Sequence, residues 1–111
     1  SGKETRDFCY IDDTVNGICK VLFNKTIPGD IFNIATGKKT TILEIANTIN
    51  NYCNNSSKIL FENLRDWDSV HHRQANIDKI SSQLGFTPTI GIDTGLKMTC
   101  DWLKKIPKLF E

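Results

Sequence analysis

Three arginines are the side chains best placed for chemistry in this sequence. Arg6 begins a short extended stretch, and Arg65 and Arg73 lie in a polar loop later in the chain. A guanidinium group can donate two parallel hydrogen bonds to phosphate oxygens, so arginines beside an extended stretch and a loop are suited to binding a pyrophosphate. For Arg6 the alternative is an exposed ion pair with the adjacent Asp7, which would contribute little.

Several other kinds of site are missing from the sequence. A dinucleotide-binding turn needs closely spaced glycines, and no G-x-G-x-x-G can be drawn through the glycines here. Neither Tyr10 nor Tyr52 is followed by a lysine four residues later, and Phe32 stands where a phosphate-binding loop ending at Lys38 would need its first glycine. We therefore expect no catalytic residue and no cofactor-binding residue in this chain.

A metal site is not expected either. The cysteines are spread singly, and the tandem pair His71 and His72 lacks the helical spacing of metal ligands. The histidine pair is therefore predicted to lie in a solvated loop. The cysteines are predicted to be reduced thiols of a cytoplasmic protein.

Length and composition indicate one ordinary globular domain. A chain of 111 residues fits a single domain, which we assign to residues 1–111. A hydrophobic content of 39% and a charged content of 24% are usual for soluble domains, and a net charge of +1 gives no reason to expect nucleic acid or a membrane as partner. No apolar run is long enough to span a bilayer.

The first third of the chain alternates between strand and helix patterns. Residues 6–11 predict a short strand, and the next apolar residues recur at helical spacing, with Asp12 or Asp13 as the helix cap: Val15, Ile18, Cys19 and Leu22. Pro28-Gly29 predicts a turn. Residues 31–35 then predict a buried strand, followed by a loop.

The rest of the chain continues this alternation. Thr41 and Glu44 fit a capping box for a second amphipathic helix, which the polar run 54–57 ends. Residues 59–61 predict a third strand, before the polar loop 62–75. Asn76 is expected to cap a short helix that Gly85 ends, and a last helix over about 92–105 is expected to turn Leu96, Cys100 and Leu103 inward.

Strands alternating with helices indicate an α/β fold with a partial sheet of short strands and flanking helices. Three short strands make a thin sheet. Such a sheet is normally the edge of something larger. We therefore expect exposed apolar surface where a missing half would dock.

Three blocks of the sequence resemble one enzyme family. They are Thr5-Arg6-Asp7-Phe8-x-Tyr10-Ile11-Asp12-Asp13, then residues 29–37, and then Arg65-x-Trp67-Asp68-x-Val70-x-x-Arg73-x-Ala75-Asn76 with its continuation to Gly95-Leu96. In this order they are similar to the extended short-chain dehydrogenase/reductases that act on nucleoside-diphosphate sugars, the epimerase/dehydratase family. The resemblance covers nearly the whole chain.

The resemblance implies that this chain is the C-terminal substrate-binding part of such an enzyme, with the Rossmann half missing. By this match Arg6 and Arg65 would hold the substrate pyrophosphate, and Asp68 would accept hydrogen bonds from the ribose hydroxyls. Phe8 would line the nucleotide pocket. Arg73 is a further candidate for phosphate contact or loop support.

The resemblance implies an NAD-dependent mechanism. A hydride is transferred from a sugar carbon to NAD, the keto intermediate is reoriented or dehydrated, and the hydride is returned to the sugar. The resemblance implies that NAD, the catalytic tyrosine and its lysine belong to the N-terminal Rossmann half of a parent enzyme. The partners that it implies are that half, a second copy in a homodimer and the nucleoside-diphosphate sugar. This chain would bind no NAD and would be inactive alone. A 4-epimerase is favoured over a 4,6-dehydratase or decarboxylase, and a stand-alone nucleotide-binding or interaction module is the other alternative.

Overall fold

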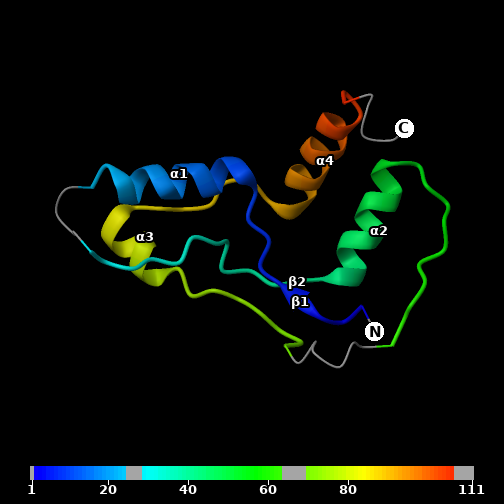
Figure 1. Ribbon diagram of the computed structural model, residues 1–111, viewed down its shortest axis with the longest axis horizontal. Helices are drawn as coiled ribbons and strands as arrows, with labels where there is room; N and C mark the ends of the chain where they lie inside the picture. The colour runs from blue at the N-terminus through cyan, green and yellow to red at the C-terminus, as the bar shows by residue number, and fades with distance from the viewer. Residues whose placement is uncertain (1, 25–28, 64–69, 107–111) are drawn as a thin grey trace.

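The computed structural model describes residues 2–24, 29–63 and 70–106 and contains four helices and one two-stranded sheet in this part of the chain (Figure 1). The order is β1 (Thr5–Arg6), α1 (Ile11–Leu22), β2 (Thr40–Thr41), α2 (Ile42–Tyr52), α3 (Asp78–Leu84) and α4 (Ile92–Leu103). The strands are antiparallel, with Thr5 opposite Thr41, and Thr5 also forms an isolated parallel bridge with His72.

The helices gather in pairs at the two ends of an elongated molecule. Figure 1 shows α1 beside α3 at one end and α2 beside α4 at the other, with β1 and β2 between them. The second pair is in direct contact. The small sheet therefore lies where the two helical ends join, and this is also where the predicted binding segments meet.

The start of α1 differs from the prediction. The extended stretch predicted for residues 6–11 keeps only Thr5 and Arg6 as a strand, and α1 begins at Ile11 with Tyr10 as its N-cap residue. The prediction that Asp12 or Asp13 caps α1 is wrong, because both lie inside the first turn. Asp13 instead turns inward, where it is buried.

The predicted caps of the other helices are largely confirmed. The Thr41 Oγ1 accepts a hydrogen bond from the Glu44 amide at 3.1 Å, and the Glu44 carboxylate accepts one from the Thr41 amide at 2.7 Å, so the capping box at α2 is present. Gly85 ends α3 in the left-handed conformation, with φ of 61°. The prediction that Asn76 caps α3 is wrong by one residue, because Ile77 is the N-cap, although the Asn76 side chain accepts a hydrogen bond from the Asp78 amide at 2.8 Å.

Two predicted strands do not form. Residues 31–35 and 59–61 have no strand assignment, so the sheet of three short strands expected from the sequence is wrong for the described residues. A strand needs a neighbouring strand to satisfy its backbone donors and acceptors. Among the described residues, no backbone hydrogen bond joins residues 32–35 to another segment.

The core is small for a chain of this length. The buried apolar side chains in the described part are those of Ala35, Ile80, Phe86 and Cys100. The accessible surface is 8543 Å², whereas a compact protein of this mass exposes roughly 6,200 Å². The radius of gyration is 16.9 Å, compared with about 13 Å for a compact domain of 100 residues. The chain is therefore open, and much apolar surface stays uncovered.

No helix in the described part of the chain combines the length and apolar character needed to cross a membrane.

Candidate functional site

The Asp7 carboxylate ties together three segments that are far apart in the sequence. It accepts hydrogen bonds from the Thr36 amide at 2.9 Å, from the Thr36 hydroxyl, from the Gly37 amide at 2.9 Å and from the Ala75 amide at 3.3 Å. The Gln74 side chain adds a bond to the Gly37 carbonyl at 2.6 Å. Asp7 thus fixes the loop after residue 35 and the segment before α3 against the end of β1.

The backbone of β1 holds the same downstream segment. The Thr5 amide donates to the His71 carbonyl at 2.9 Å, and the Arg73 amide donates to the Thr5 carbonyl at 3.0 Å. The Thr5 hydroxyl lies 3.1 Å from His72 Nδ1. These bonds place residues 71–73 directly beside Arg6, although more than sixty positions separate them in the sequence.

A hollow of about 610 Å³, which we call the arginine hollow, opens at this junction. Its lining residues come from the end of β1, the segment 33–35 and the segment before α3: Arg6, Asp7, Asn33, Ala35, His72, Arg73, Gln74, Ala75 and Asn76. The structure therefore brings Arg6 and Arg73 to one cavity. Arg65 and Asp68, the other two predicted site residues of the loop, lie outside the described residues.

The Arg6 side chain is already oriented by the backbone. Its Nη1 donates to the Thr5 carbonyl at 2.8 Å and to the His71 carbonyl at 3.3 Å. Both bonds are made by one nitrogen of a planar group that carries five N–H donors. Orientation by carbonyl groups reduces the side-chain freedom that anion binding would otherwise have to remove.

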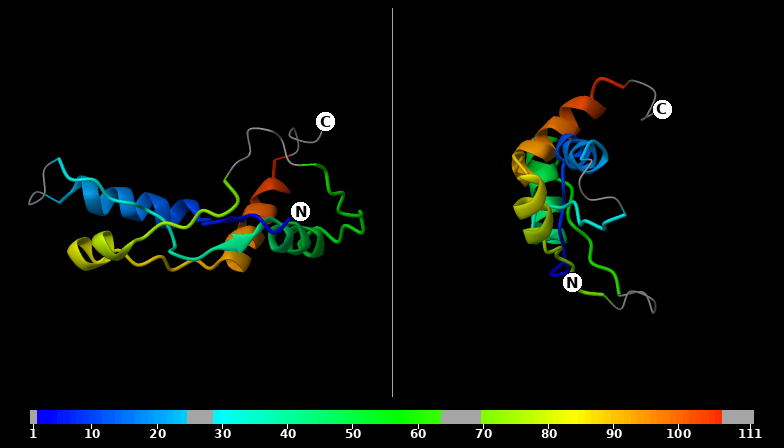
Figure 2. Two further views of the ribbon diagram at one scale, coloured as in Figure 1. Left: turned by 90° about the horizontal axis from the view of Figure 1, so that it is seen from below. Right: turned by 90° about the vertical axis from the view of Figure 1, so that its left-hand side faces the viewer.

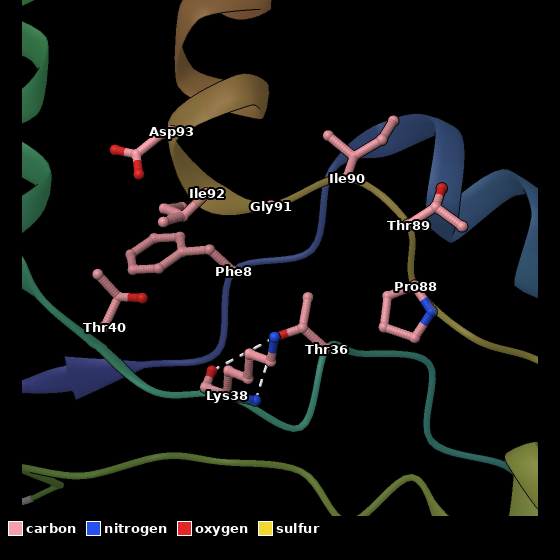
Figure 3. Close-up of a pocket in the computed structure, with 10 residues that line it drawn as sticks. All are labelled: Phe8, Thr36, Lys38, Thr40, Pro88, Thr89, Ile90, Gly91, Ile92 and Asp93. Carbon is pink, nitrogen blue, oxygen red and sulfur yellow. Dashed lines mark hydrogen bonds between the residues drawn. The ribbon is translucent and has the colours of Figure 1, made fainter.

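Phe8 lines a different cavity. Figure 3 shows this second hollow, with the Phe8 ring projecting from the segment after β1 toward Ile92 at the start of α4. Its volume is about 420 Å³, and we call it the Phe8 hollow; it is lined by Phe8, Thr36, Lys38, Thr40, Pro88, Thr89, Ile90, Gly91, Ile92 and Asp93. Both hollows are within the size range of small-molecule sites.

Thr36 links the two hollows. It lines the Phe8 hollow, while its amide and hydroxyl donate to Asp7 in the lining of the arginine hollow. The Thr36 hydroxyl also accepts from the Lys38 amide at 3.2 Å, one of the contacts drawn in Figure 3. A ligand with a charged and a flat apolar part could contact both hollows across this threonine.

Asp13 fixes the far wall of the Phe8 hollow. Its carboxylate accepts bonds from the Thr89 amide and hydroxyl, each at 3.0 Å, and from the Ile90 amide at 2.8 Å. Burial raises the pKa of this carboxyl, but the hydrogen bonds from Ile90 and Thr89 outweigh it and hold the pKa below its usual value. Asp13 is therefore an ionised anchor for residues 89 and 90.

Sequence reasoning missed the two anchoring carboxylates. Asp7 was considered only as an ion-pair partner of Arg6, and Asp13 only as a helix cap. Each is part of the first sequence block, but its partners follow 29 to 77 positions later. In the described part of the chain, no group of three or more acidic, histidine or cysteine side chains could hold a metal ion.

The chain has curated relatives over almost its whole length. It is 34% identical over 101 residues to an uncharacterised protein of Methanocaldococcus jannaschii, covering 91% of this chain and 30% of that protein. It is 30% identical over 110 residues to the UDP-N-acetyl-alpha-D-glucosaminuronate decarboxylase of Bacillus cytotoxicus, covering 95% of this chain and 34% of that enzyme. The chain thus spans about a third of the length of these relatives. No family model matches it.

Solved structures agree with these relatives. An epimerase of Methanothermobacter thermautotrophicus aligns with a TM-score of 0.91 and 28% identity over 95% of this chain and 31% of that one. The UDP-glucuronic acid 4-epimerase of Bacillus cereus, solved in complex with NAD, aligns with a TM-score of 0.81 and 31% identity over 97% of this chain and 33% of that one.

Sequence and shape thus match the same group of proteins over about 95% of this chain, as the sequence blocks predicted. The chain fits the C-terminal portion of an extended short-chain dehydrogenase/reductase of the nucleotide-sugar epimerase and decarboxylase family.

Proposed function

We propose that this chain is the nucleotide-sugar-binding portion of an NAD-dependent nucleoside-diphosphate-sugar 4-epimerase. The observation that carries the proposal is the arginine hollow, where Arg6 and Arg73 meet although 67 positions separate them in the sequence. Two guanidinium groups beside one cavity match the charge of a pyrophosphate. Arg65 and Asp68 are proposed to complete this site, as the family resemblance implies.

The Phe8 hollow is proposed to receive the nucleoside. An aromatic ring and neighbouring apolar side chains such as Ile90 and Ile92 offer a flat surface for a base, and Thr36 and Thr40 offer hydroxyl groups for polar contacts. Since Thr36 connects the two hollows, a nucleoside in one would direct its pyrophosphate toward the other.

The reaction is proposed to take place on a longer polypeptide whose remaining part carries NAD and the catalytic groups. NAD would accept the hydride and return it. The residues of this chain would bind and orient the nucleotide so that the sugar points toward the cofactor. Support comes from the relatives, which are about three times longer, and from the NAD complex of the Bacillus cereus epimerase.

A decarboxylase is the second candidate, because curated relatives of this chain include UDP-sugar decarboxylases. The test is to express this chain within its full coding sequence and to incubate the protein with NAD and UDP-glucuronic acid. Mass spectrometry then separates the outcomes. An epimerase gives a product of unchanged mass that chromatography resolves from the substrate, whereas a decarboxylase gives a product that has lost carbon dioxide.

Binding should be measured separately from turnover. If the full protein neither binds a nucleoside diphosphate nor converts a UDP-sugar while remaining folded, the proposal is wrong. If it binds the nucleotide and gives no product with several UDP-sugars, the nucleotide-binding role stands and the epimerase assignment fails.

A further inference from the structure

Two of the four cysteines come together where α2 and α4 end. Cys53 is the C-cap residue of α2, and Cys100 lies in the last turn of α4. The two helices are in direct contact, and Figures 1 and 2 show them side by side at one end of the molecule, away from α1 and α3. In Figure 1 both helices run upward, so their C-terminal ends lie on the same side.

Hydrogen bonds join the two helix ends. Lys104, which follows α4, donates from Nζ to the Tyr52 carbonyl at 3.4 Å, and its amide donates to the Cys100 carbonyl at 3.1 Å. Tyr52 precedes Cys53 in the chain. The Cys53 thiol is in turn a hydrogen-bond partner of the Cys100 thiol. The two sulfur atoms are therefore neighbours, as the partners of a disulfide must be.

The two thiols differ in their access to solvent. Cys53 is exposed, whereas Cys100 is buried, with 7% of its surface accessible. Burial, and then the neighbouring Cys53 thiol, raise the pKa of Cys100 above its usual value. Because the thiolate is the form that attacks, Cys100 is protected from a first reaction with a reagent in solution. Cys53 is the thiol that such a reagent meets first, and Cys100 lies behind it.

We propose that Cys53 and Cys100 are a redox-responsive pair that forms a reversible disulfide, with a low-molecular-weight disulfide as the oxidant. The Cys53 thiolate attacks one sulfur of the oxidant, which releases a first small thiol and leaves a mixed disulfide on Cys53. The Cys100 sulfur then attacks the Cys53 sulfur and releases a second small thiol. Two protein thiols are oxidised, one small disulfide is reduced, and the two protein-thiol protons end on the released thiols.

The helices that this disulfide joins also begin at the Phe8 hollow. Thr40, in the strand that leads directly into α2, lines that hollow, and so do Ile92 and Asp93 in the first turn of α4 (Figure 3). A disulfide at the far ends limits the motion of α2 against α4 and holds these walls in place. Since an ordered cavity has less freedom to lose on binding, the oxidised protein should bind a nucleotide more tightly. This consequence rests on the proposed function, whereas formation of the disulfide does not.

Peptide mapping tests the pair directly. The full-length protein is equilibrated with oxidised and reduced glutathione, free thiols are blocked with N-ethylmaleimide under denaturing conditions, and the unreduced protein is digested with trypsin. Cleavage after lysine and arginine places Cys53 in peptide 40–58 and Cys100 in peptide 98–104. These two peptides should be recovered as one linked species from monomeric protein, and dithiothreitol should separate them.

Cys19 is the internal control for this map. It is exposed like Cys53 but belongs to α1, at the other end of the molecule. It should carry only maleimide or glutathione. Cys53 recovered only as a glutathione adduct, with Cys100 blocked by maleimide, would overturn the proposal. A Cys53–Cys100 link found only in covalent dimers would overturn it as well.

Serine variants test the order of the two steps. In Cys100→Ser, the mixed disulfide at Cys53 lacks the second thiol and should accumulate at least about tenfold over wild type. In Cys53→Ser, where the changed side chain is exposed, Cys100 should remain free at the same glutathione ratio. Melting temperatures are recorded for both variants, because Cys100 is buried. Glutathione on Cys100 in folded Cys53→Ser would show that the buried thiol reacts independently, and the proposal would fail.

Binding tests the effect on the Phe8 hollow. Calorimetry with UDP should give a dissociation constant about three- to tenfold lower for the oxidised than for the reduced full-length protein. Cys53→Ser, which cannot form the disulfide, should give the same constant under both conditions. An unchanged constant in the fully oxidised wild type would overturn the link to the hollow. Absence of any UDP binding would sink the proposed function, while the peptide map would still decide whether the thiol pair forms its disulfide.

Discussion

At the scale of single residues, two carboxylates and a pair of arginines account for the candidate site. Asp7 and Asp13 accept hydrogen bonds from segments far along the chain, and these bonds set the walls of the two hollows. Arg6 and Arg73 then supply positive charge to one of them. The acidic residues build the site, while the arginines are the proposed ligand contacts.

The three arginines should contribute unequally to nucleotide binding. In the full-length protein, Arg6→Ala or Arg65→Ala should weaken nucleoside-diphosphate binding by roughly ten- to a hundredfold, because each loses a charge-assisted contact of about 1.5–3 kcal/mol. Arg73→Ala should have a smaller effect, and so should Asp68→Ala. Arg6→Lys should restore only part of the loss, since an ammonium group lacks the planar fork.

Titration calorimetry gives the dissociation constants. The melting temperature of each variant is recorded in parallel, because Arg6 also donates to the carbonyl groups of Thr5 and His71. Wild-type affinity in folded Arg6→Ala and Arg65→Ala variants would make these arginines structural.

Asp13 should make stability depend on pH. Its hydrogen bonds hold the folded-state pKa below the unfolded value, so the folded protein binds fewer protons and stability rises with pH. The contribution is fully present above about pH 4, the ordinary range of an aspartate, and is lost as the pH falls through the lowered folded pKa. Asp13→Asn should reduce the free energy of unfolding by about 1–3 kcal/mol at neutral pH.

Urea unfolding at several pH values measures this effect. The difference between wild type and Asp13→Asn should narrow below about pH 4. Asp12→Asn, at the exposed neighbouring position, is the matched control. If the difference in the free energy of unfolding between wild type and Asp13→Asn stays constant down to about pH 2, the carboxylate charge does not contribute to stability.

At the scale of elements, α1 is held by close packing at a single glycine. A Cβ atom at Gly17 would lie 2.7 Å from the Ile34 Cγ2 and 3.1 Å from the Phe86 Cε2. Distances below 3.0 Å require movement, and the Ile34 methyl group is close to its own backbone. The glycine thus allows α1 to approach residues 34 and 86 closely.

Gly17→Ala should therefore destabilise this chain by about 1–3 kcal/mol through overpacking, even though alanine is favoured over glycine in helices by roughly 1 kcal/mol. Asn16→Ala, one position earlier and exposed, should be neutral or slightly stabilising. Thermal or urea unfolding compares the two variants. An increase in stability for Gly17→Ala would mean that α1 moves freely on residues 34 and 86.

At the scale of the whole molecule, the chain has two hollows of ligand size but little core. Its open shape and exposed large apolar side chains agree with the exposed apolar surface expected from the sequence. The family match covers about 95% of this chain and about a third of its relatives.

This chain alone should bind no NAD. Its glycines lack the spacing that brings a backbone close to the cofactor pyrophosphate at a helix N-terminus. Calorimetry with millimolar NAD at neutral pH should show no saturable heat, whereas the full-length protein should bind NAD under the same conditions. A specific micromolar isotherm for this chain would contradict the assignment of the cofactor site to the remaining part.

The sequence alone determined the local features of the fold. The helices at α1, α2, α3 and α4, the capping box at Thr41 and Glu44, and the left-handed Gly85 all depend on residues within a few positions of each other. The segments that line the candidate site were also recognisable, because their motifs are short and ordered along the chain. Sequence patterns report such local preferences directly.

Only the tertiary structure decided which distant segments meet. The partners of Asp7 and Asp13, the cavity shared by Arg6 and Arg73, and the exposure of the apolar side chains of α1 depend on contacts between residues many positions apart. The strand predicted for residues 31–35 shows the same limit. Strand composition is a property of the segment, but a strand exists only when a neighbouring strand supplies its hydrogen bonds.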